Sequence, residues 1–138
     1  MTAHAESTSA SLLYLLLALG DLPDAEGTLS HAASHVGVAQ CFAVLLRALP
    51  FHASRGHLVI PADIAAKHNV RQEDVFRGRP AAGLEDAVYE FAVAANDHLL
   101  TARAVFERQG GRVPRAAMPV FLTGVSPAVF GTAAAAGS

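Results

Sequence analysis

The sequence has no tryptophan, a single cysteine and few charged side chains, and these shortages exclude several classes of protein. With one cysteine, Cys41, the chain forms neither an intrachain disulfide nor a cysteine-based zinc cluster of its own. Charged residues make up 16% of the chain, below the roughly 25% of an average soluble domain. The formal net charge is −2, and no basic and aromatic nucleic-acid motif is present. We therefore expect no nucleic-acid partner, and a surface partly covered by other chains or by lipid.

A long hydrophobic run is also lacking. The longest, from Leu12 to Leu19, is far shorter than the roughly 20 residues that span a bilayer. Its length suits a signal peptide, but no Lys or Arg precedes it and the following Gly20-Asp21-Leu22-Pro23 is not a small-residue cleavage site. The first basic residue is Arg47, so no Arg-rich presequence is visible.

The residues that are abundant favour helices. The chain is 52% hydrophobic, and alanine, leucine and valine dominate. Its 138 residues are enough for one domain with a core. We predict an all-α domain over 7–125, with a disordered N-terminus at 1–6 and a loose Ala/Gly tail at 126–138. The predicted helices cover 7–19, 29–49, 62–68, 70–76, 83–109 and 115–125.

Local signals set the ends of these helices. Ser7 to Ser9 offer N-caps for the first helix, and Pro50 ends the second, leaving 51–60 as an exposed loop. Asn69 is expected to close a short helix in the left-handed conformation, and Pro119 to kink or restrict the last helix. The helix over 83–109 is the clearest, because one apolar stripe runs along it: Leu84, Ala87, Val88, Phe91, Ala94, Ala95, Leu99, Ala102 and Phe106.

The most informative stretch is LRALPFHASRGHLVIP, from Leu46 to Pro61. The helix that leads into it is apolar. Four positions spaced by three, four and four residues share one face if the helix runs that far, and they are Cys41, Val44, Ala48 and His52. That face has no carboxylate, although Arg47, Arg55 and Gly56 keep the frame of an active-site motif around it.

Several segments in series resemble the squalene/phytoene synthase family, and most closely its mitochondrial complex I assembly factor 6 branch. They are STSASLLYLLLALG, HAASHVGVAQ, LRALPFHASRGHLVIPADI, VRQEDVFRG and DAVYEFAVAANDHLLTARAVF. Their order fits from about residue 7 to residue 122. The resemblance covers roughly the C-terminal half of such a domain and implies a partial isoprenoid-synthase-like helical bundle.

The resemblance also identifies what the motif has lost. Active members resemble N-x-x-R-D-x-x-E-D at this point, where carboxylates hold Mg²⁺ against a diphosphate leaving group. The asparagine falls on Val44, the first aspartate on Ala48, the glutamate on Phe51 and the second aspartate on His52. Apolar side chains do not bind a hard cation, and one histidine replaces oxygen ligands poorly. We therefore predict no prenyl transfer, no catalytic residues and no cofactor.

The function implied is that of a non-catalytic protein of mitochondrial respiratory complex I, either a bound accessory subunit or an assembly factor. Its expected partners are protein subunits of that complex, including a paralogous chain or one that supplies the missing half of the bundle, with possible lipid contact. The expected location is the mitochondrion, on the matrix side or associated with the inner membrane. Two alternatives remain open: an isoprenoid- or lipid-binding pseudoenzyme, and an active prenyl-diphosphate transferase.

Two further groups of residues are candidate sites. His31 and His35 are four residues apart and share a helix face, which suits a metal, but we favour two ordinary histidines and predict no metal site. Arg47, Arg55 and His57 suit an anion or lipid headgroup. The alternative for these three is a structural role, in which they pair with acids at Asp63, Glu73 or Asp74.

The remaining reactive side chains have ordinary interpretations. Cys41 lies in an apolar helix without an obvious base, which favours a buried and inert thiol. Asp86 and Glu90 resemble a pair of acids, but they lie near a helix N-terminus, where carboxylates are stabilised and solvated. Ser54 and Ser126 have no triad around them.

Overall fold

The protein is described by a computed structural model, which defines residues 2–19 and 27–122. These residues form helices and turns and no strand, which confirms the all-α prediction. The elements in order are α1 (Thr2–Ala5), η1 (Glu6–Ala10), α2 (Ser11–Leu19), α3 (Thr28–Arg47), α4 (Leu49–Ala53), α5 (Ala62–Lys67), α6 (Gln72–Phe76), α7 (Leu84–Glu107) and α8 (Met118–Phe121).

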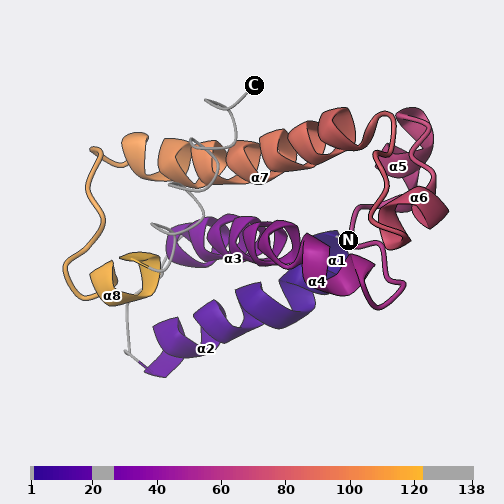
Figure 1. The fold of residues 1–138 in the computed structure, drawn as a ribbon. Helices are drawn as coiled ribbons and strands as arrows, with labels where there is room; N and C mark the ends of the chain where they lie inside the picture. The colour runs from indigo at the N-terminus through magenta and orange to yellow at the C-terminus, as the bar shows by residue number, and fades with distance from the viewer. Residues whose placement is uncertain (1, 20–26, 123–138) are drawn as a thin grey trace.

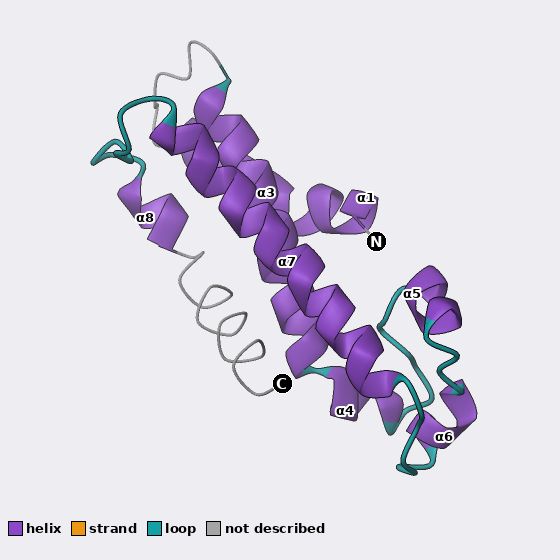
Figure 2. Ribbon diagram, turned by 90° about the horizontal axis from the view of Figure 1, so that it is seen from above, coloured by secondary structure: helices purple, strands orange, loops and turns teal. Residues whose placement is uncertain are grey.

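Helix α3 lies at the centre of the bundle. It runs between α2 and α7, and α7 lies alongside it in the opposite direction (Figures 1 and 2). The short helices α5 and α6 gather at the end where α7 begins, and α8 lies at the other end. Although α3 is long and apolar enough to cross a membrane, most of its hydrophobic side chains are buried against its neighbours, as in a core helix of a globular domain.

The core follows the apolar stripes of the two long helices. Phe91 on α7 is only 1% exposed, and its ring centroid lies 4.7 Å from that of Phe42 on α3. This aromatic contact joins the middle of the bundle. The buried positions of α7 are Ala87, Phe91, Ala92, Ala95, Ala102 and Phe106, which agrees closely with the predicted stripe.

The N-terminal prediction is wrong for the described part of 1–6, because Thr2–Ala5 is helical. Ser7 and Thr8 do not cap a new helix; both hydroxyls donate to the carbonyl of His4 and join α1 to the π-helix η1. This segment is held by close packing on α3. A Cβ at Gly37 would lie 2.5 Å from the Cα of Ala10, so only glycine permits the approach.

The predicted helix over 29–49 divides into two. Helix α3 ends at Arg47, and α4 begins at Leu49 with Pro50 in its first turn. The expectation of a loop from Phe51 was therefore wrong for Phe51 to Ala53. Proline has no N–H to donate, which suits it to the start of a helix as well as to ending one.

The remaining boundaries follow the sequence signals closely. Asn69 has φ 53°, as predicted for a left-handed cap after α5. Helix α7 ends before Gly110 and Gly111, both with positive φ. The last helix is shorter than predicted, since α8 starts at Met118 and holds Pro119 in its first turn. The predicted helical residues 123–125, the tail at 126–138 and most of the link at 20–27 lie outside the described residues.

Candidate functional site

The face predicted to hold Cys41, Val44, Ala48 and His52, which we call the α3–α4 face, keeps its helical register across the break between α3 and α4. The N–H of Ala48 donates to the carbonyl of Val44, and the N–H of His52 donates to that of Ala48, each at 3.0 Å. These steps of four residues hold the three side chains on one side, as the spacing predicted. Val44 is 56% exposed, while Cys41, Ala48 and His52 are half-buried. The face presents a thiol, two aliphatic groups and an imidazole.

Cys41 is the only nucleophile on this face. Burial raises the pKa of the Cys41 thiol, while a hydrogen bond with the Ser9 side chain acts in the opposite direction. A raised thiol pKa keeps the sulfur protonated near neutral pH, so it is a poor nucleophile and a poor metal ligand. This agrees with its interpretation as an inert thiol.

Cationic and aromatic side chains meet just beyond this face. The guanidinium carbon of Arg55 lies 4.3 Å from the ring centroid of Phe51, and the Phe51 ring contacts that of His52 edge to face at 5.4 Å. Phe51 is 54% exposed, and Arg47, Arg55 and His57 are exposed as well. We call Arg47, Phe51, Arg55 and His57 the α4 patch.

The acids expected as alternative partners do not pair with this patch. Glu73 forms its ion pair with Arg77, one turn further along α6. Among the described residues, no ion pair joins Asp63 or Asp74 to Arg47 or Arg55. The sequence itself indicates that Arg47 and Arg55 lack acids nearby in the chain, because no Asp or Glu occurs from 27 to 62.

The two predicted metal candidates lie in a row of rings. The His31 and His35 rings on α3 meet edge to face at 4.9 Å, and His98 on α7 adds a third ring 5.1 Å from His35. Within 2–19 and 27–122 no group of three or more His, Cys, Asp or Glu side chains is placed to hold a metal ion. The sequence interpretation missed His98, because only the tertiary packing brings it to His35.

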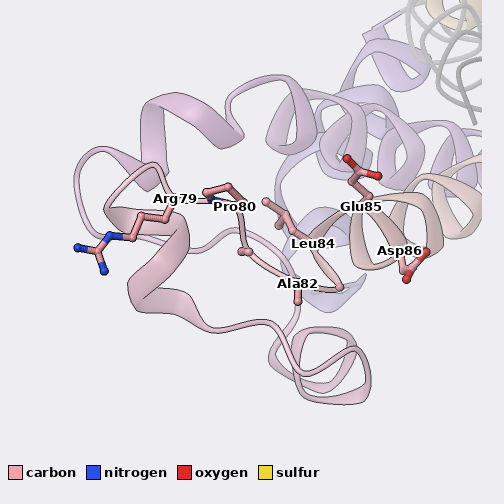
Figure 3. Close-up of a pocket in the computed structure, with 8 residues that line it drawn as sticks. Arg79, Pro80, Ala82, Leu84, Glu85 and Asp86 are labelled. Atoms are coloured by element: carbon pink, nitrogen blue, oxygen red, sulfur yellow. The ribbon is translucent and has the colours of Figure 1, made fainter.

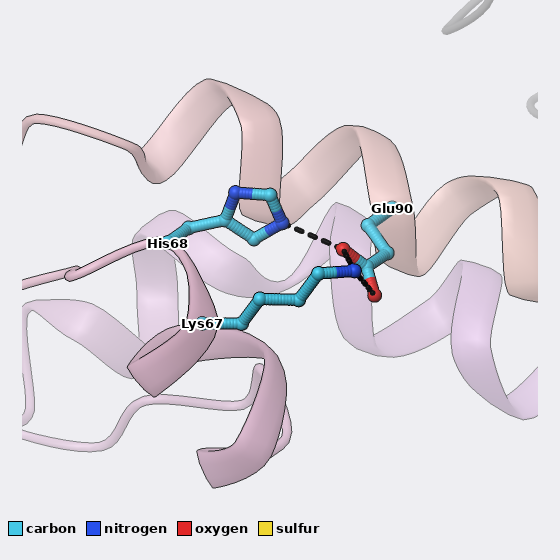
Figure 4. Close-up of polar contacts among 3 residues, drawn as sticks. All are labelled: Lys67, His68 and Glu90. Carbon is cyan, nitrogen blue, oxygen red and sulfur yellow. Dashed lines mark hydrogen bonds and ion pairs between the residues drawn. The ribbon is translucent and has the colours of Figure 1, made fainter.

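The two acids considered on α7, Asp86 and Glu90, have different surroundings. Glu90 accepts hydrogen bonds from Lys67 at 2.9 Å and 3.0 Å and lies 2.6 Å from the imidazole of His68 (Figure 4). Hydrogen bonds from Lys67 and His68 hold the pKa of the Glu90 carboxyl below its ordinary value. Glu90 thus links α5 to α7 through contacts that remain at the solvated surface, with the Lys67 and Glu90 side chains 65% and 34% exposed.

Asp86 belongs to an open pocket where α7 begins. Figure 3 shows Arg79 directed away from Glu85 and Asp86, so opposite charges line different parts of this hollow. A second and more apolar hollow of about 370 Å³ is lined by residues of α4, α6 and the start of α7, among them Leu49, Phe76 and Leu84. Neither arrangement brings together an acid, a base and a nucleophile.

Comparison with known proteins places this geometry in a family. The model of the family described as squalene/phytoene synthase matches residues 1–129. The chain belongs to the squalene/phytoene synthase family. The family fold is an all-helical, isoprenoid-synthase-like bundle, in agreement with α1 to α8. No solved structure matched the chain significantly.

Curated relatives within this family share one name. "NADH dehydrogenase (ubiquinone) complex I, assembly factor 6" of Rattus norvegicus is 40% identical over 126 residues, which cover 91% of this chain and 36% of that protein. The protein of the same name in Homo sapiens is 41% identical over 123 residues, 89% of this chain and 35% of its own length. The homolog in Drosophila melanogaster is 37% identical over 124 residues. The chain therefore spans about a third of the length of these relatives.

Proposed function

We propose that this protein acts in the assembly of mitochondrial respiratory complex I without catalysing a reaction, as an assembly factor or as a bound accessory subunit. The observation that carries the proposal is about 40% identity, over nine-tenths of the chain, to relatives named complex I assembly factor 6. Its partners would be protein subunits of complex I, and its site of action the mitochondrion, on the matrix side or at the inner membrane.

The composition of the α3–α4 face supports a non-catalytic role. Prenyl transfer from a diphosphate needs Mg²⁺ held by carboxylates, which neutralises the leaving group. Val44, Ala48 and His52 offer no carboxylate, and from 27 to 62 the chain supplies none at all. Asp63 lies in the first turn of α5. One carboxylate supplies too few oxygen ligands for a cluster of ions.

Co-purification from mitochondria tests the role in complex I. A tagged full-length protein should migrate with complex I proteins on native gels. Migration with the intact complex identifies a subunit, whereas migration with partial complexes alone identifies an assembly factor. Failure to associate with either would contradict the proposal. Magnesium-dependent turnover of farnesyl or geranylgeranyl diphosphate would contradict the non-catalytic part.

Exposed apolar side chains on the long helices support binding to another chain. Tyr89, Val93 and Leu100 of α7 are 48%, 39% and 53% exposed and recur on the side opposite the buried stripe. Leu12 and Leu15 of α2 are 59% and 62% exposed. Such faces are covered in assemblies. A paralogous chain, or one that carries the other helices of the family bundle, is the partner that would cover them.

The α4 patch supports a second candidate function, the binding of an anionic headgroup or of an isoprenoid lipid that carries one. Arg55 is held over the Phe51 ring, Arg47 is exposed, and neither forms an ion pair with a described acid. Guanidinium groups bind phosphate through paired hydrogen bonds. The half-exposed Phe51 would lie against the apolar part of the same ligand.

Vesicle flotation tests the second function. We expect the protein to float with vesicles of phosphatidylcholine and phosphatidylglycerol, and less with phosphatidylcholine alone. The double variant Arg47→Gln/Arg55→Gln should lose most of this binding. Arg77→Gln, which removes a cation that is already paired with Glu73, is the matched control. Equal binding of both variants would remove the α4 patch from the proposal.

A further inference from the structure

His35 on α3 and His98 on α7 meet where the two longest helices pack. Their Nδ1 atoms lie 2.8 Å apart across 63 residues of sequence, and both side chains are half-buried. The His31 ring lies edge-on to His35, and the Phe42 ring lies edge-on to His98 with centroids 5.9 Å apart. Aromatic groups thus enclose a direct nitrogen-to-nitrogen contact inside the main helix interface.

Two imidazole nitrogens at this distance share one proton. In the neutral pair, one ring donates its Nδ1–H and the other accepts through the lone pair on its Nδ1. When both rings are protonated, each Nδ1 carries a hydrogen, so neither accepts. Two positive charges then face each other at close range in a partly dry interface. The contact therefore exists only while at least one ring is neutral.

We propose that the His35–His98 pair is a proton-sensitive latch between α3 and α7, closed at neutral pH and opened by acidification. The latch concerns the packing of the bundle itself and stands apart from the role in complex I. Opening would weaken the packing of α3 against α7, although the core around Phe42 and Phe91 still holds the two helices together.

Other ionisable groups lie beside the pair or on the elements packed against its two helices. Asp97, next to His98 on α7, favours the charged form of His98, and His31 is a second titratable ring beside His35. The other elements packed on α3 or α7 carry His4 in α1, Glu6 in η1, Tyr14 in α2, His52 in α4, and Asp63 and Lys67 in α5, while α8 carries no ionisable side chain.

The direction of the pH effect follows from burial. Burial lowers the pKa of His98, and Asp97 opposes this shift only partly. Because the folded-state value lies below the ordinary value of about 6.5, the unfolded chain binds more protons below that pH. The stability contributed by neutral His98 is complete above about pH 6.5 and is lost as the pH falls from there through the folded-state pKa.

Thermal unfolding at pH 7.5 and pH 5.5 tests the latch. We expect the Tm of the unmodified protein to be lower at pH 5.5 by an amount on the order of 5 °C. His98→Gln keeps one donor and one acceptor beside His35 but does not titrate, so it should lose about half of this decrease or more. His4→Gln, at an exposed position, should retain the full decrease. An equal decrease in all three proteins would overturn the proposal.

Nitrogen NMR of the imidazole rings in the unmodified protein provides a test that does not depend on a variant. Long-range proton–nitrogen spectra at pH 7.5 should show one Nδ1 protonated and the other bare, with His98 titrating below the ordinary imidazole value of about 6.5. Independent titration of His35 and His98 around that value would overturn the latch. A rise in Tm on adding Zn²⁺ that His98→Gln abolishes would also overturn it, since the pair would then be a metal site.

Discussion

Helices α3 and α4 carry no acid, whereas α5 to α7 carry most of the acids in the chain. The ion pairs between described residues all lie in the second region, and they join Lys67 and His68 to Glu90, Arg77 to Glu73, and Arg103 to Glu107. In the first region, Arg47 and Arg55 are exposed and have no such partner. The same fold thus contains a region in which several charges are paired with one another and a region whose arginines are exposed without such pairs.

The difference separates structural charge from charge available to a partner. Glu90 fastens α5 to α7 and leaves little for another molecule to neutralise. Arg55 instead lies over the exposed ring of Phe51. An external anion can pair with its guanidinium without first breaking an ion pair within the protein. Two regions of similar helical content therefore have different expected roles, one in holding the bundle and one in binding.

Phe91→Ala should produce the largest effect, because Phe91 packs on Phe42 and belongs to the core that both regions share. Removing a ring that is 1% exposed should cost about 3–5 kcal/mol of unfolding free energy. Urea unfolding should still show one transition, at lower denaturant. Leu100→Ala, at a position 53% exposed on the same helix, should change stability by less than about 0.5 kcal/mol. Two separate transitions in Phe91→Ala would show that the regions fold independently.

Gly83→Ala and Gly56→Ala compare the two regions at the same backbone φ, since both glycines have φ 76°. A Cβ at Gly83 would lie 2.0 Å from the carbonyl oxygen of His68, whereas one at Gly56 would meet nothing within 4 Å. We expect Gly56→Ala to cost about 1 kcal/mol from the left-handed backbone. Gly83→Ala should cost about 2–4 kcal/mol, because the clash adds to that strain. Equal losses in urea unfolding would mean that α5 is not firmly packed on α7.

Glu90→Gln should weaken the paired region by less than Gly83→Ala does. The Glu90 pKa is lowered from about 4.5 by Lys67 and then by His68. A carboxylate with a lowered folded-state pKa adds stability above the unfolded value, and this stability is lost as the pH falls through the folded value. The free energy of unfolding, measured from pH 6 to pH 3, should therefore depend less on pH in Glu90→Gln than in the unmodified protein. Glu85→Gln, an exposed acid in the first turn of α7, should keep the pH dependence of the unmodified protein.

Local signals predicted the parts of the fold that depend on local physics. The stripe through Phe91 and the left-handed Asn69 needed only helical spacing and backbone sterics, and both agree with the structure. Helix α4 was missed because Pro50 both ends one helix and begins another. The π-helix η1 was missed because helical spacing does not distinguish it from an α-helix, and its close packing of Ala10 on Gly37 joins residues far apart in the sequence.

The candidate site also combines features that the sequence predicted with features that depend on tertiary packing. Spacing alone placed Val44, Ala48 and His52 on one side of the chain, and the hydrogen bonds of the backbone maintain that arrangement. The stacking of Arg55 on Phe51 depends on α4, which was not predicted, and the contact of His35 with His98 depends on helix packing. Helical periodicity and capping signals predict which residues share a face, but they do not predict which distant side chains come into contact.

Two double-mutant cycles test the comparison most directly, although the effect we expect from them is the smallest. Arg77 and Glu73 form an exposed pair one helical turn apart, so their coupling in unfolding free energy should be about 0.3–0.5 kcal/mol. Arg55 and Asp63 form no ion pair, and their coupling should be zero within error. A coupling between Arg55 and Asp63 as large as that of the first pair would mean that the α4 patch is neutralised internally. The charge difference between the two regions would then disappear, and with it the reason to expect an anion at Arg55.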